Sequence, residues 1–389
     1  MRLGIVGKPN VGKSTFFQCI TDSDAEVGDY PFTTVDPNHG VGYVVVDCAC
    51  QRLQVECDVD RCVDGRRKVP VNVADVAGLV PGAAEGRGMG NEFLDDMRAA
   101  DALIHVLDVS GRTDAAGEPA EDYDVAEDVE FIADELDAWL AGLLQQRWDR
   151  LTKALQEPDT RPDAVIADHL SGLGITQNDV ATVLEADTSA LQRWTGDDIE
   201  EFVQRLRRQA MPMLHACNKT DMPGAAGNLD RLEQAFPAAT FVPVSAQAEQ
   251  ELQAAAEQGK IDYVPGDSDF DIVGDVSEEQ EDGLEQIRGL LQEYGGTGVQ
   301  QVMREAVFDL LDMIVVYPVE DASNYTDQHG NVLPDAVLVP EGATPVDLAY
   351  EIHSDIGDDY AAAVDAETGR AIGKETALEE GQVVKIETQ

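Results

Sequence analysis

Short apolar runs alternate with longer amphipathic stretches along much of the chain. RLGIV (residues 2–6) and MLHAC (residues 213–217) are two such runs, and each is typical of a buried strand. Because strands of this kind alternate with stretches at helical spacing, the pattern predicts an α/β fold. The predicted strands cover residues 2–6, 42–47, 71–75, 102–108, 213–217 and 240–244.

The interval between Asp108 and Asn218 is too long for one crossover and must hold an insertion. Within it, the apolar residues fall at helical spacing. Further helices are predicted over residues 164–173, 179–185 and 198–208, with ITQND and TGDD as N-terminal caps. The apolar stripe is read as a core, with a groove for a partner as the alternative. The residues of the stripe are Val129, Ile132, Leu136, Trp139, Leu140, Leu143 and Leu144, extended by Trp148 and Leu151.

The last part of the chain changes character. An acidic loop is expected over residues 263–280, followed by helices over residues 283–293 and 298–311. Beyond Ile314, strand-like runs surround a single helix over residues 344–352, which suggests a β-grasp unit, and His353 is expected to cap that helix. The expected domains are an α/β domain of residues 1–119 and 211–312, a helical subdomain of residues 120–210 inserted into it, and a β-grasp domain of residues 313–389.

Charge changes this picture of an ordinary α/β protein. The chain has 27 basic and 76 acidic residues, so its formal net charge is −49. Such self-repulsion opposes compaction at low salt, but at about 1 M salt the Debye length falls to about 3 Å. We read the evenly spread acidity as adaptation to a cytoplasm rich in KCl, as in a salt-loving archaeon; the alternative is an acidic protein with a basic partner.

One motif predicts a phosphate site. GKPNVGKST (residues 7–15) follows the first strand and opens a helix, which is the P-loop pattern. Glycines let the backbone curl so that successive N–H groups point at an anion, and the helix N-terminus adds partial positive charge. Lys13 is expected to reach the β- and γ-phosphates, and the Ser14 hydroxyl to bind Mg²⁺. The predicted nucleotide contacts from this loop are Asn10, Val11, Gly12, Lys13, Ser14 and Thr15.

Two further segments would sense the terminal phosphate. Asp75, at the end of a strand, suits the magnesium shell, and Gly78 in DVAGL (residues 75–79) would offer its N–H to the γ-phosphate. In YPFTT (residues 30–34), Thr34 would complete the magnesium shell, with Thr33 as the alternative. The glycine-rich stretch after DVAGL fits a nucleotide-dependent loop.

The base site is predicted from NKTD (residues 218–221) and from SAQAE (residues 245–249). Asp221 would accept from guanine N1–H and the 2-amino group, which adenine cannot match, and losing such a pair costs a few kcal/mol. Asn218 would brace the loop, and the stem of Lys219 would lie over the ring. The backbone N–H groups of Ser245 and Ala246 would meet guanine O6.

Leu79 stands where many GTPases carry a glutamine that orients water. An aliphatic side chain cannot hydrogen-bond a nucleophile, so intrinsic hydrolysis must be slow or use another group. One hypothesis is that Asn10 helps to hold a K⁺ near the phosphates; the alternative is that Asn10 is a turn residue.

Four cysteines cluster between these segments in a C-x-C-x6-C-x4-C pattern. Cys48, Cys50, Cys57 and Cys62 could close tetrahedrally on Zn²⁺, remain reduced and unliganded, or form disulfides. Cys19 and Cys217 are expected to be small buried hydrophobic residues.

Taken together, these segments resemble the Obg-like GTPases, in particular their YchF-related branch, and the C-terminal part resembles the TGS domain. The resemblance extends from Arg2 to the C-terminus. It implies a P-loop fold with a mostly parallel sheet, helices on both faces, and a β-grasp TGS-like domain. It also implies that Leu79 is the hydrophobic replacement for glutamine. The TGS-like domain implies docking to RNA or the ribosome. YchF-type relatives with an altered base motif prefer ATP, whereas NKTD is the guanine form, as in archaeal and fungal relatives.

The sequence therefore predicts a Mg²⁺-dependent switch that hydrolyses GTP to GDP and phosphate. An ATPase and a nucleotide sensor with negligible turnover are the alternatives. A cytoplasmic protein is expected, because no signal peptide or membrane span is recognisable. A monomer is also expected.

Overall fold

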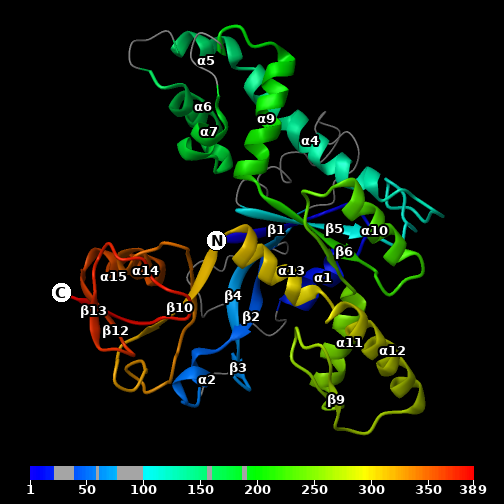
Figure 1. The fold of residues 1–389 in the computed structure, drawn as a ribbon, viewed down its shortest axis with the longest axis vertical. Coiled ribbons are helices and arrows are strands. Elements are labelled where there is room, and N and C mark those ends of the chain that lie inside the picture. Colours follow the sequence, from blue (N-terminus) through cyan, green and yellow to red (C-terminus); the bar gives the residue numbers. More distant parts are fainter. Residues whose placement is uncertain (22–38, 58–60, 77–99, 156–159, 186–190) are drawn as a thin grey trace. The chain divides into compact units, whose positions relative to one another are not determined.

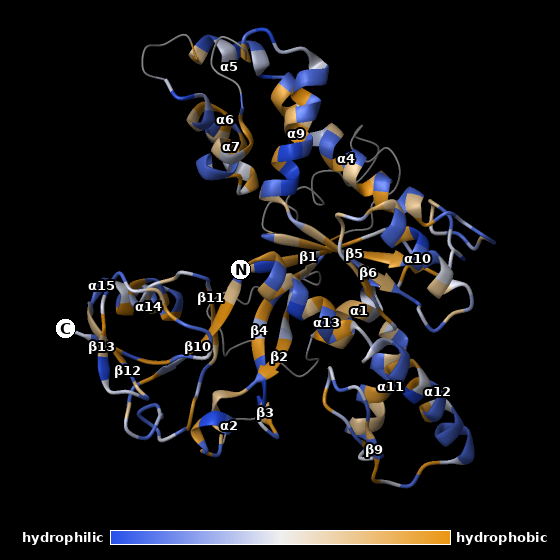
Figure 2. Ribbon diagram, in the orientation of Figure 1, coloured by the Kyte–Doolittle hydropathy of each residue, from blue (hydrophilic) through white to orange (hydrophobic). Residues whose placement is uncertain are grey.

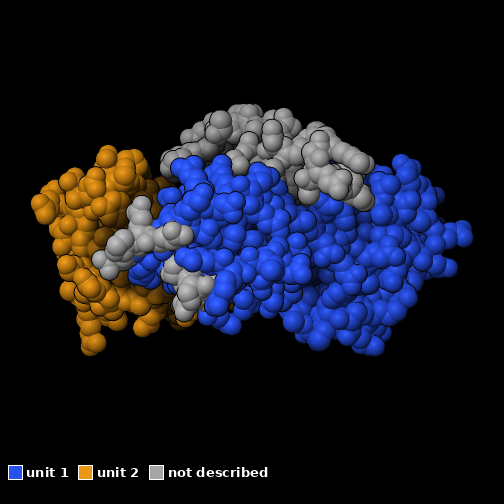
Figure 3. Space-filling model, turned by 90° about the horizontal axis from the view of Figure 1, so that it is seen from above, with its two compact units in different colours: residues 1–41, 72–263, 268–302 blue, residues 42–71, 264–267, 303–389 orange. Residues whose placement is uncertain are grey.

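The computed structural model describes residues 1–21, 39–57, 61–76, 100–155, 160–185 and 191–389 (Figure 1). The chain divides into two compact units, which Figure 3 colours separately. Unit 1 comprises residues 1–41, 72–263 and 268–302, and unit 2 comprises residues 42–71, 264–267 and 303–389. Among the described residues, no helix combines the length and apolar character that a bilayer crossing requires.

A seven-stranded sheet contains strands at the six predicted apolar runs and one further strand, β3; its order is β2-β4-β1-β5-β6-β7, with β3 paired to β4. Strand β1 runs parallel to β4 and β5, β6 runs parallel to β5 and β7, and β3 is antiparallel to β4. Because parallel strands end at the same edge, this order brings the carboxyl ends of β1, β4, β5 and β6 together. The strands are β1 (Arg2–Val6), β2 (His39–Asp47), β3 (Cys62–Val63), β4 (Arg66–Asp75), β5 (Ala102–Asp108), β6 (Met213–Asn218) and β7 (Phe241–Pro243).

Helices and a small hairpin complete this part of the chain. Figure 2 shows the strands of the sheet largely in hydrophobic colours and α12 largely in hydrophilic ones. The remaining elements are α1 (Lys13–Ile20), α2 (Ala49–Leu53), α10 (Ala225–Ala235), α11 (Ala246–Glu257), β8 (Ile261–Asp262), β9 (Asp271–Ile272), α12 (Glu278–Tyr294), α13 (Val299–Arg304) and a π-helical turn (Glu305–Leu310).

The insertion after β5 is helical, as predicted. Helices α4 and α9 pack side by side (Figure 1). The rings of Trp148 and Trp194 stack with centroids 5.5 Å apart, and a buried ion pair joins Arg207 to Asp137 at 2.6 Å. The apolar stripe lies mostly in this core, so the core reading is supported over the groove. The helices are α4 (Ala126–Gln145), α5 (Trp148–Ala154), α6 (Pro162–Leu170), α7 (Gln177–Val183) and α9 (Gly196–Ala210), with a 3-10 turn at Ser171–Leu173.

The C-terminal part is the predicted β-grasp, a five-stranded sheet of order β11-β10-β14-β12-β13. Its apolar core contains Leu348 of α14 and Val316 of β10. His353 is the C-cap of α14, as predicted, and its ring also accepts the N–H of Asp355. The elements are β10 (Met313–Val319), β11 (Val337–Pro340), α14 (Pro345–Ile352), α15 (Ser354–Asp358), β12 (Tyr360–Asp365), β13 (Arg370–Ile372) and β14 (Val383–Thr388).

Some predicted boundaries are wrong. The acidic loop expected over residues 263–280 contains β9 and ends early, because Ser277 and Gln280 form a capping box that starts α12 at Glu278. The strand predicted from residue 71 begins at Arg66, since β3 pairs with it through Cys62 and Arg67. Both misses arise from hydrogen bonds that apolar periodicity does not register. The predicted domain boundaries themselves stay a prediction.

Candidate functional site: a nucleotide pocket

The phosphate loop joins the end of β1 to the start of α1. Gly7 has φ 148° and Gly12 has φ 97°, a region that side-chain-bearing residues seldom adopt. A Cβ on Gly12 would lie 2.2 Å from Nδ2 of Asn218, and one on Gly7 would lie 2.5 Å from the backbone O of Val106. Glycine at these two positions is therefore required both by the turn and by the close approach of β5 and β6.

Lys13 opens α1, and its ammonium group turns back over the loop. Its Nζ donates to the backbone O of Lys8 at 2.8 Å. Burial lowers the pKa of Lys13, and the negative charge of Asp75 partly opposes that change. This places a cation at the position where the motif predicts phosphate to bind.

Asp75 lies at the carboxyl end of β4, paired in register with Ile5 of the adjacent β1. Burial raises the pKa of the Asp75 carboxyl, and Lys13 opposes the rise. Ser14, in the first turn of α1, is exposed. The structure thus brings together Lys13 and Asp75, while Thr34, Gly78 and Leu79 lie outside the described residues, and the roles predicted for them stay predictions.

The side chain of Asn218, at the end of β6, ties three segments together. Its Nδ2 donates to the backbone O of Val11 at 2.8 Å, and its Oδ1 accepts the N–H of Ala246 at 3.0 Å. The side chain is almost fully buried. The predicted base loop is therefore fixed directly to the phosphate loop, and the two motifs follow the carboxyl ends of β1 and β6, with β5 between them.

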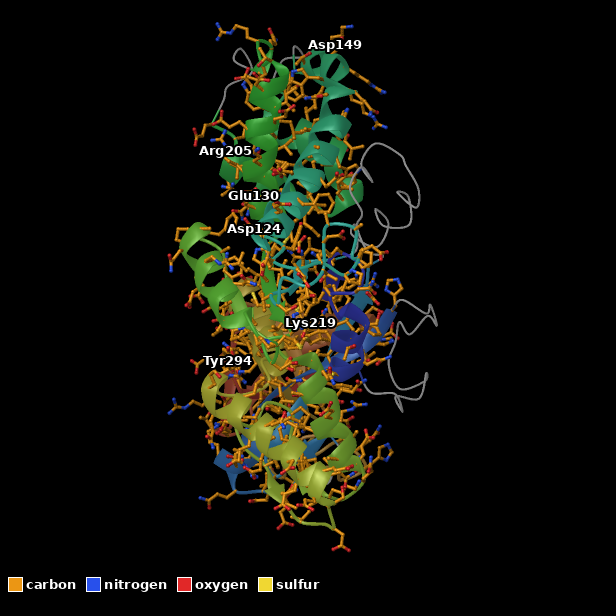
Figure 4. The ribbon with its side chains drawn as sticks, turned by 90° about the vertical axis from the view of Figure 1, so that its right-hand side faces the viewer. Asp124, Glu130, Asp149, Arg205, Lys219 and Tyr294 are labelled. Carbon is orange, nitrogen blue, oxygen red and sulfur yellow. The ribbon has the colours of Figure 1, made fainter. Side chains whose placement is uncertain are left out.

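Lys219 continues from Asn218 with φ 68°, and its Nζ donates to the backbone O of Asn10 at 2.9 Å (Lys219 is labelled in Figure 4). The same Nζ forms an ion pair with Asp108 at 2.7 Å, at the end of β5. Although burial opposes its charged form, bonds from Lys219, Ser110 and Thr113 lower the pKa of the Asp108 carboxyl. We did not predict this role of Asp108; the available signal was a carboxylate at the carboxyl end of a central strand.

Asp221 and Ser245 form the far side of the base site. The Oγ of Ser245 donates to Oδ1 of Asp221 at 2.7 Å, which leaves the other carboxylate oxygen for a ligand. Ser245 N–H donates to the backbone O of Thr297 at 2.9 Å, and Ala246 N–H is bonded to Asn218. To bind guanine O6, these N–H groups would have to share their hydrogens between O6 and their present acceptors, or exchange those acceptors for O6. Their contact with O6 stays a prediction.

A second buried cation supports the phosphate loop from behind. The side chain of Lys8 is 4% exposed, and its Nζ forms an ion pair with Asp128 at 2.6 Å. The same Nζ donates to the backbone O of Thr113 at 2.8 Å and lies 4.1 Å from the centroid of the Tyr123 ring. Because both members of this pair are buried, removing either would leave an uncompensated charge. The partner of Lys8 comes from α4, and no local pattern in the sequence points to it.

Asn10 has the left-handed conformation of a turn residue, with φ 64°, and its Nδ2 donates to the backbone O of Gly117 at 2.9 Å. These contacts favour the turn interpretation and give K⁺ no support. All six cysteines are free, so the disulfide alternative is absent from the structure, and Cys19 and Cys217 are buried as expected.

Three parts of the chain match described families. Residues 2–137 match the family described as "50S ribosome-binding GTPase", residues 216–321 match "Obg-like GTPase YGR210-like, G4 motif-containing domain", and residues 324–388 match "TGS domain".

Three relatives and one solved structure are similar to between two thirds and all of the chain. An uncharacterized GTP-binding protein of Methanocaldococcus jannaschii is 45% identical over 388 residues, covering 99% of this chain and 98% of the relative. One of Schizosaccharomyces pombe is 36% identical, covering 88% and 87%. The "Ribosome-binding ATPase YchF" of Haemophilus ducreyi is 31% identical, covering 68% and 70%. The crystal structure of a GTP-binding protein from Pyrococcus horikoshii is 35% identical, covers 100% of both chains and has a TM-score of 0.78.

Proposed function

Because this chain belongs to the Obg-like, YchF-type GTPases, we propose that it binds GTP between the phosphate loop and residues 218–221 and hydrolyses it to GDP and phosphate. The observation that carries the proposal is the side chain of Asn218, which bonds to Val11 and to Ala246. One nucleotide can then meet Lys13 with its phosphates and Asp221 with its base.

Guanine is proposed over adenine because of Asp221. Its carboxylate is held by Ser245 and would accept the N1–H and 2-amino donors of guanine. Adenine offers neither donor, so the carboxylate would remain unpaired. The relatives named as GTP-binding proteins align over nearly the whole chain, which supports the same choice, while relatives named as ATPases keep ATP as the alternative.

Mg²⁺ fits the donor set at the phosphate edge. The Asp75 carboxylate and the Ser14 hydroxyl are hard oxygen ligands, and Thr34 is proposed to add a third. The bound ion would neutralise charge on the β- and γ-phosphates. Lys13 would contribute a fixed positive charge beside the transferred group, and Gly78 a backbone N–H, and such positioning supplies most of phosphoryl-transfer catalysis.

Turnover is proposed to depend on a partner. Leu79 cannot orient the attacking water, so a group from outside the pocket would have to do so, or hydrolysis would stay slow. The TGS domain at residues 324–388 and the relative named as a ribosome-binding protein support a ribosome or RNA as that partner. A sensor with negligible turnover remains the second candidate function, and Leu79 is the observation that favours it.

The first experiment tests the base. Displacement of a fluorescent guanine nucleotide by GTP and by ATP is measured on the full chain in molar KCl, where the charge of −49 is screened. We expect GTP to displace it at lower concentration, and Asp221→Asn to weaken GTP binding about 10- to 100-fold, the value of a charge-assisted pair. Asp230→Asn, the same change on the exposed face of α10, is the matched control. Equal displacement by ATP and GTP would sink the guanine assignment.

The second experiment tests hydrolysis. Single-turnover release of phosphate from GTP is followed with and without ribosomes, in KCl and in NaCl. Acceleration by ribosomes supports the proposed partner, whereas no turnover under any condition would leave the sensor as the function. A KCl-specific rate would revive a potassium site despite the contacts of Asn10.

A further inference from the structure

Four of the six cysteines gather at one point in unit 2, outside the nucleotide pocket. Cys48 caps α2 and Cys50 lies within it, Cys57 follows it, and Cys62 begins β3. Their sulfur atoms all lie within 4.8 Å of one another. Segments on either side of residues 58–60 thus converge on one small volume.

The spacing of the sulfur atoms matches a tetrahedral metal site. Zinc bound to thiolates at about 2.3 Å in a tetrahedron places neighbouring sulfurs about 3.8 Å apart. The Sγ atoms of Cys48 and Cys57 are 3.7 Å apart, and those of Cys50 and Cys62 are 3.8 Å apart. The widest pair would have to close by no more than about 1 Å to reach that geometry.

Arg67 supplies an independent sign of negative charge at this point. Its side chain is 1% exposed, its Nη2 lies 4.0 Å from Sγ of Cys57 and donates to the backbone O of Leu333, and its Nε has no partner. No carboxylate among the described residues forms an ion pair with it. A guanidinium so deeply buried needs an anion nearby, and four zinc-bound thiolates carry a net charge of about −2.

From the sulfur geometry and the buried guanidinium, we propose that Cys48, Cys50, Cys57 and Cys62 bind one structural Zn²⁺ in a closed tetrathiolate site. All four positions are filled by protein ligands, so the site has no open position for chemistry.

The site would also hold the segment around β3 and the start of β4 against the C-terminal domain. Residues 42–71 and 303–389, which contain these two parts, both belong to unit 2. Arg67 lies beside the cluster and reaches the carbonyl of Leu333, and its guanidinium lies 5.9 Å from the centroid of the Tyr317 ring on β10. Nearby, Arg52 of α2 pairs with Glu367 and donates to Gly381 O at 2.8 Å. The metal would therefore stabilise the contacts of residues 48–67 with the TGS domain rather than take part in nucleotide hydrolysis.

The test begins with metal content of the full chain purified without chelator. We expect one zinc per chain in the wild type and in Cys19→Ala, whose thiol lies outside the cluster, and loss of zinc in Cys57→Ser and Cys62→Ser. Because a variant can fail to fold, the wild type is also loaded with Co²⁺. Visible absorption and thiolate-to-cobalt charge transfer typical of a tetrahedral tetrathiolate are expected, and both should vanish when Zn²⁺ is added.

Alkylation then counts the protected thiols by mass. Zn²⁺ should shield the four clustered cysteines in the native protein, and a chelator should expose them. The proposal is overturned if two results are found together: the wild-type protein holds no bound zinc after incubation with Zn²⁺ and dialysis, and its clustered thiols are alkylated at the same rate with and without the metal. A mass deficit of about 2 Da per bridge would instead show disulfides, and would overturn it equally. None of these readouts depends on nucleotide binding.

Discussion

Replacing Asp108 by asparagine should weaken nucleotide binding although Asp108 itself is not expected to touch the nucleotide. Its Oδ2 accepts from the Nζ of Lys219 at 2.7 Å and from the hydroxyl of Thr113, and its Oδ1 accepts the N–H of Ser110 at 3.0 Å. In Asp108→Asn, the amide oxygen can still serve Ser110, but the amide NH₂ then faces Lys219, which has no acceptor to offer. The lysine stem predicted to lie over the base loses its anchor.

The magnitude follows from the burial of the pair. A hydrogen bond between charged groups contributes about 1.5 to 3 kcal/mol. Asp108 is fully buried but the side chain of Lys219 is 31% exposed, so solvent screens part of the interaction. We therefore expect a loss of about 1 to 2 kcal/mol in nucleotide affinity, which is about a 5- to 30-fold higher Kd.

Titration of a fluorescent GDP analogue in molar KCl measures the change. Asp122→Asn is the matched control, since it removes one carboxylate from an exposed position in the same connection between β5 and α4. The double variant with Lys219→Met should lose little more than Lys219→Met alone, because the two side chains act as one unit. If Asp108→Asn and the control bind within twofold of the wild type, or if the two losses simply add, the ion pair does not position Lys219.

Three further predictions concern stability, the phosphate loop and the metal. Burial lowers the pKa of both His105 and His215, and that of His215 falls from 6.5 to about 4. Between pH 6.5 and 4 the unfolded chain therefore binds protons at these imidazoles that the folded chain does not bind. The free energy of unfolding should fall as the pH drops through this window, by about 3 kcal/mol for His215. His215→Asn should flatten that part of a thermal-unfolding profile, and an unchanged slope would refute the reasoning. Gly12→Ala should abolish tight nucleotide binding, because its Cβ would strike Asn218 at 2.2 Å, while Gly142→Ala, in open space on α4, should bind normally in the same titration. Removing Mg²⁺ with EDTA should weaken the binding of GTP more than that of GDP, since a Mg²⁺ held by Asp75 and Ser14 would offset the additional negative charge of the γ-phosphate; equal weakening in a competition assay would contradict this.

Much of the fold can be predicted from the sequence, because the patterns that specify it involve residues close together in the chain. The P-loop glycines and the apolar runs specify their own backbone conformations. Thr176 and Thr195 form the capping boxes that begin α7 and α9, as ITQND and TGDD predicted. The capping box at Ser277 is equally local, but apolar periodicity does not register it, because it consists of hydrogen bonds made by polar side chains.

The side-chain partners, by contrast, were decided by tertiary structure. Lys219 and Asp108 are separated by 111 residues, and Arg67 and Leu333 by 266. A sequence shows which side chains carry charge, but it does not show which of them meet once strands β4, β1, β5 and β6 align. A buried cation is stable only beside the group that compensates it, and the packing of distant elements chooses that group. The sequence motifs thus predict the nucleotide, while the tertiary structure determines which side chains hold those motifs in place.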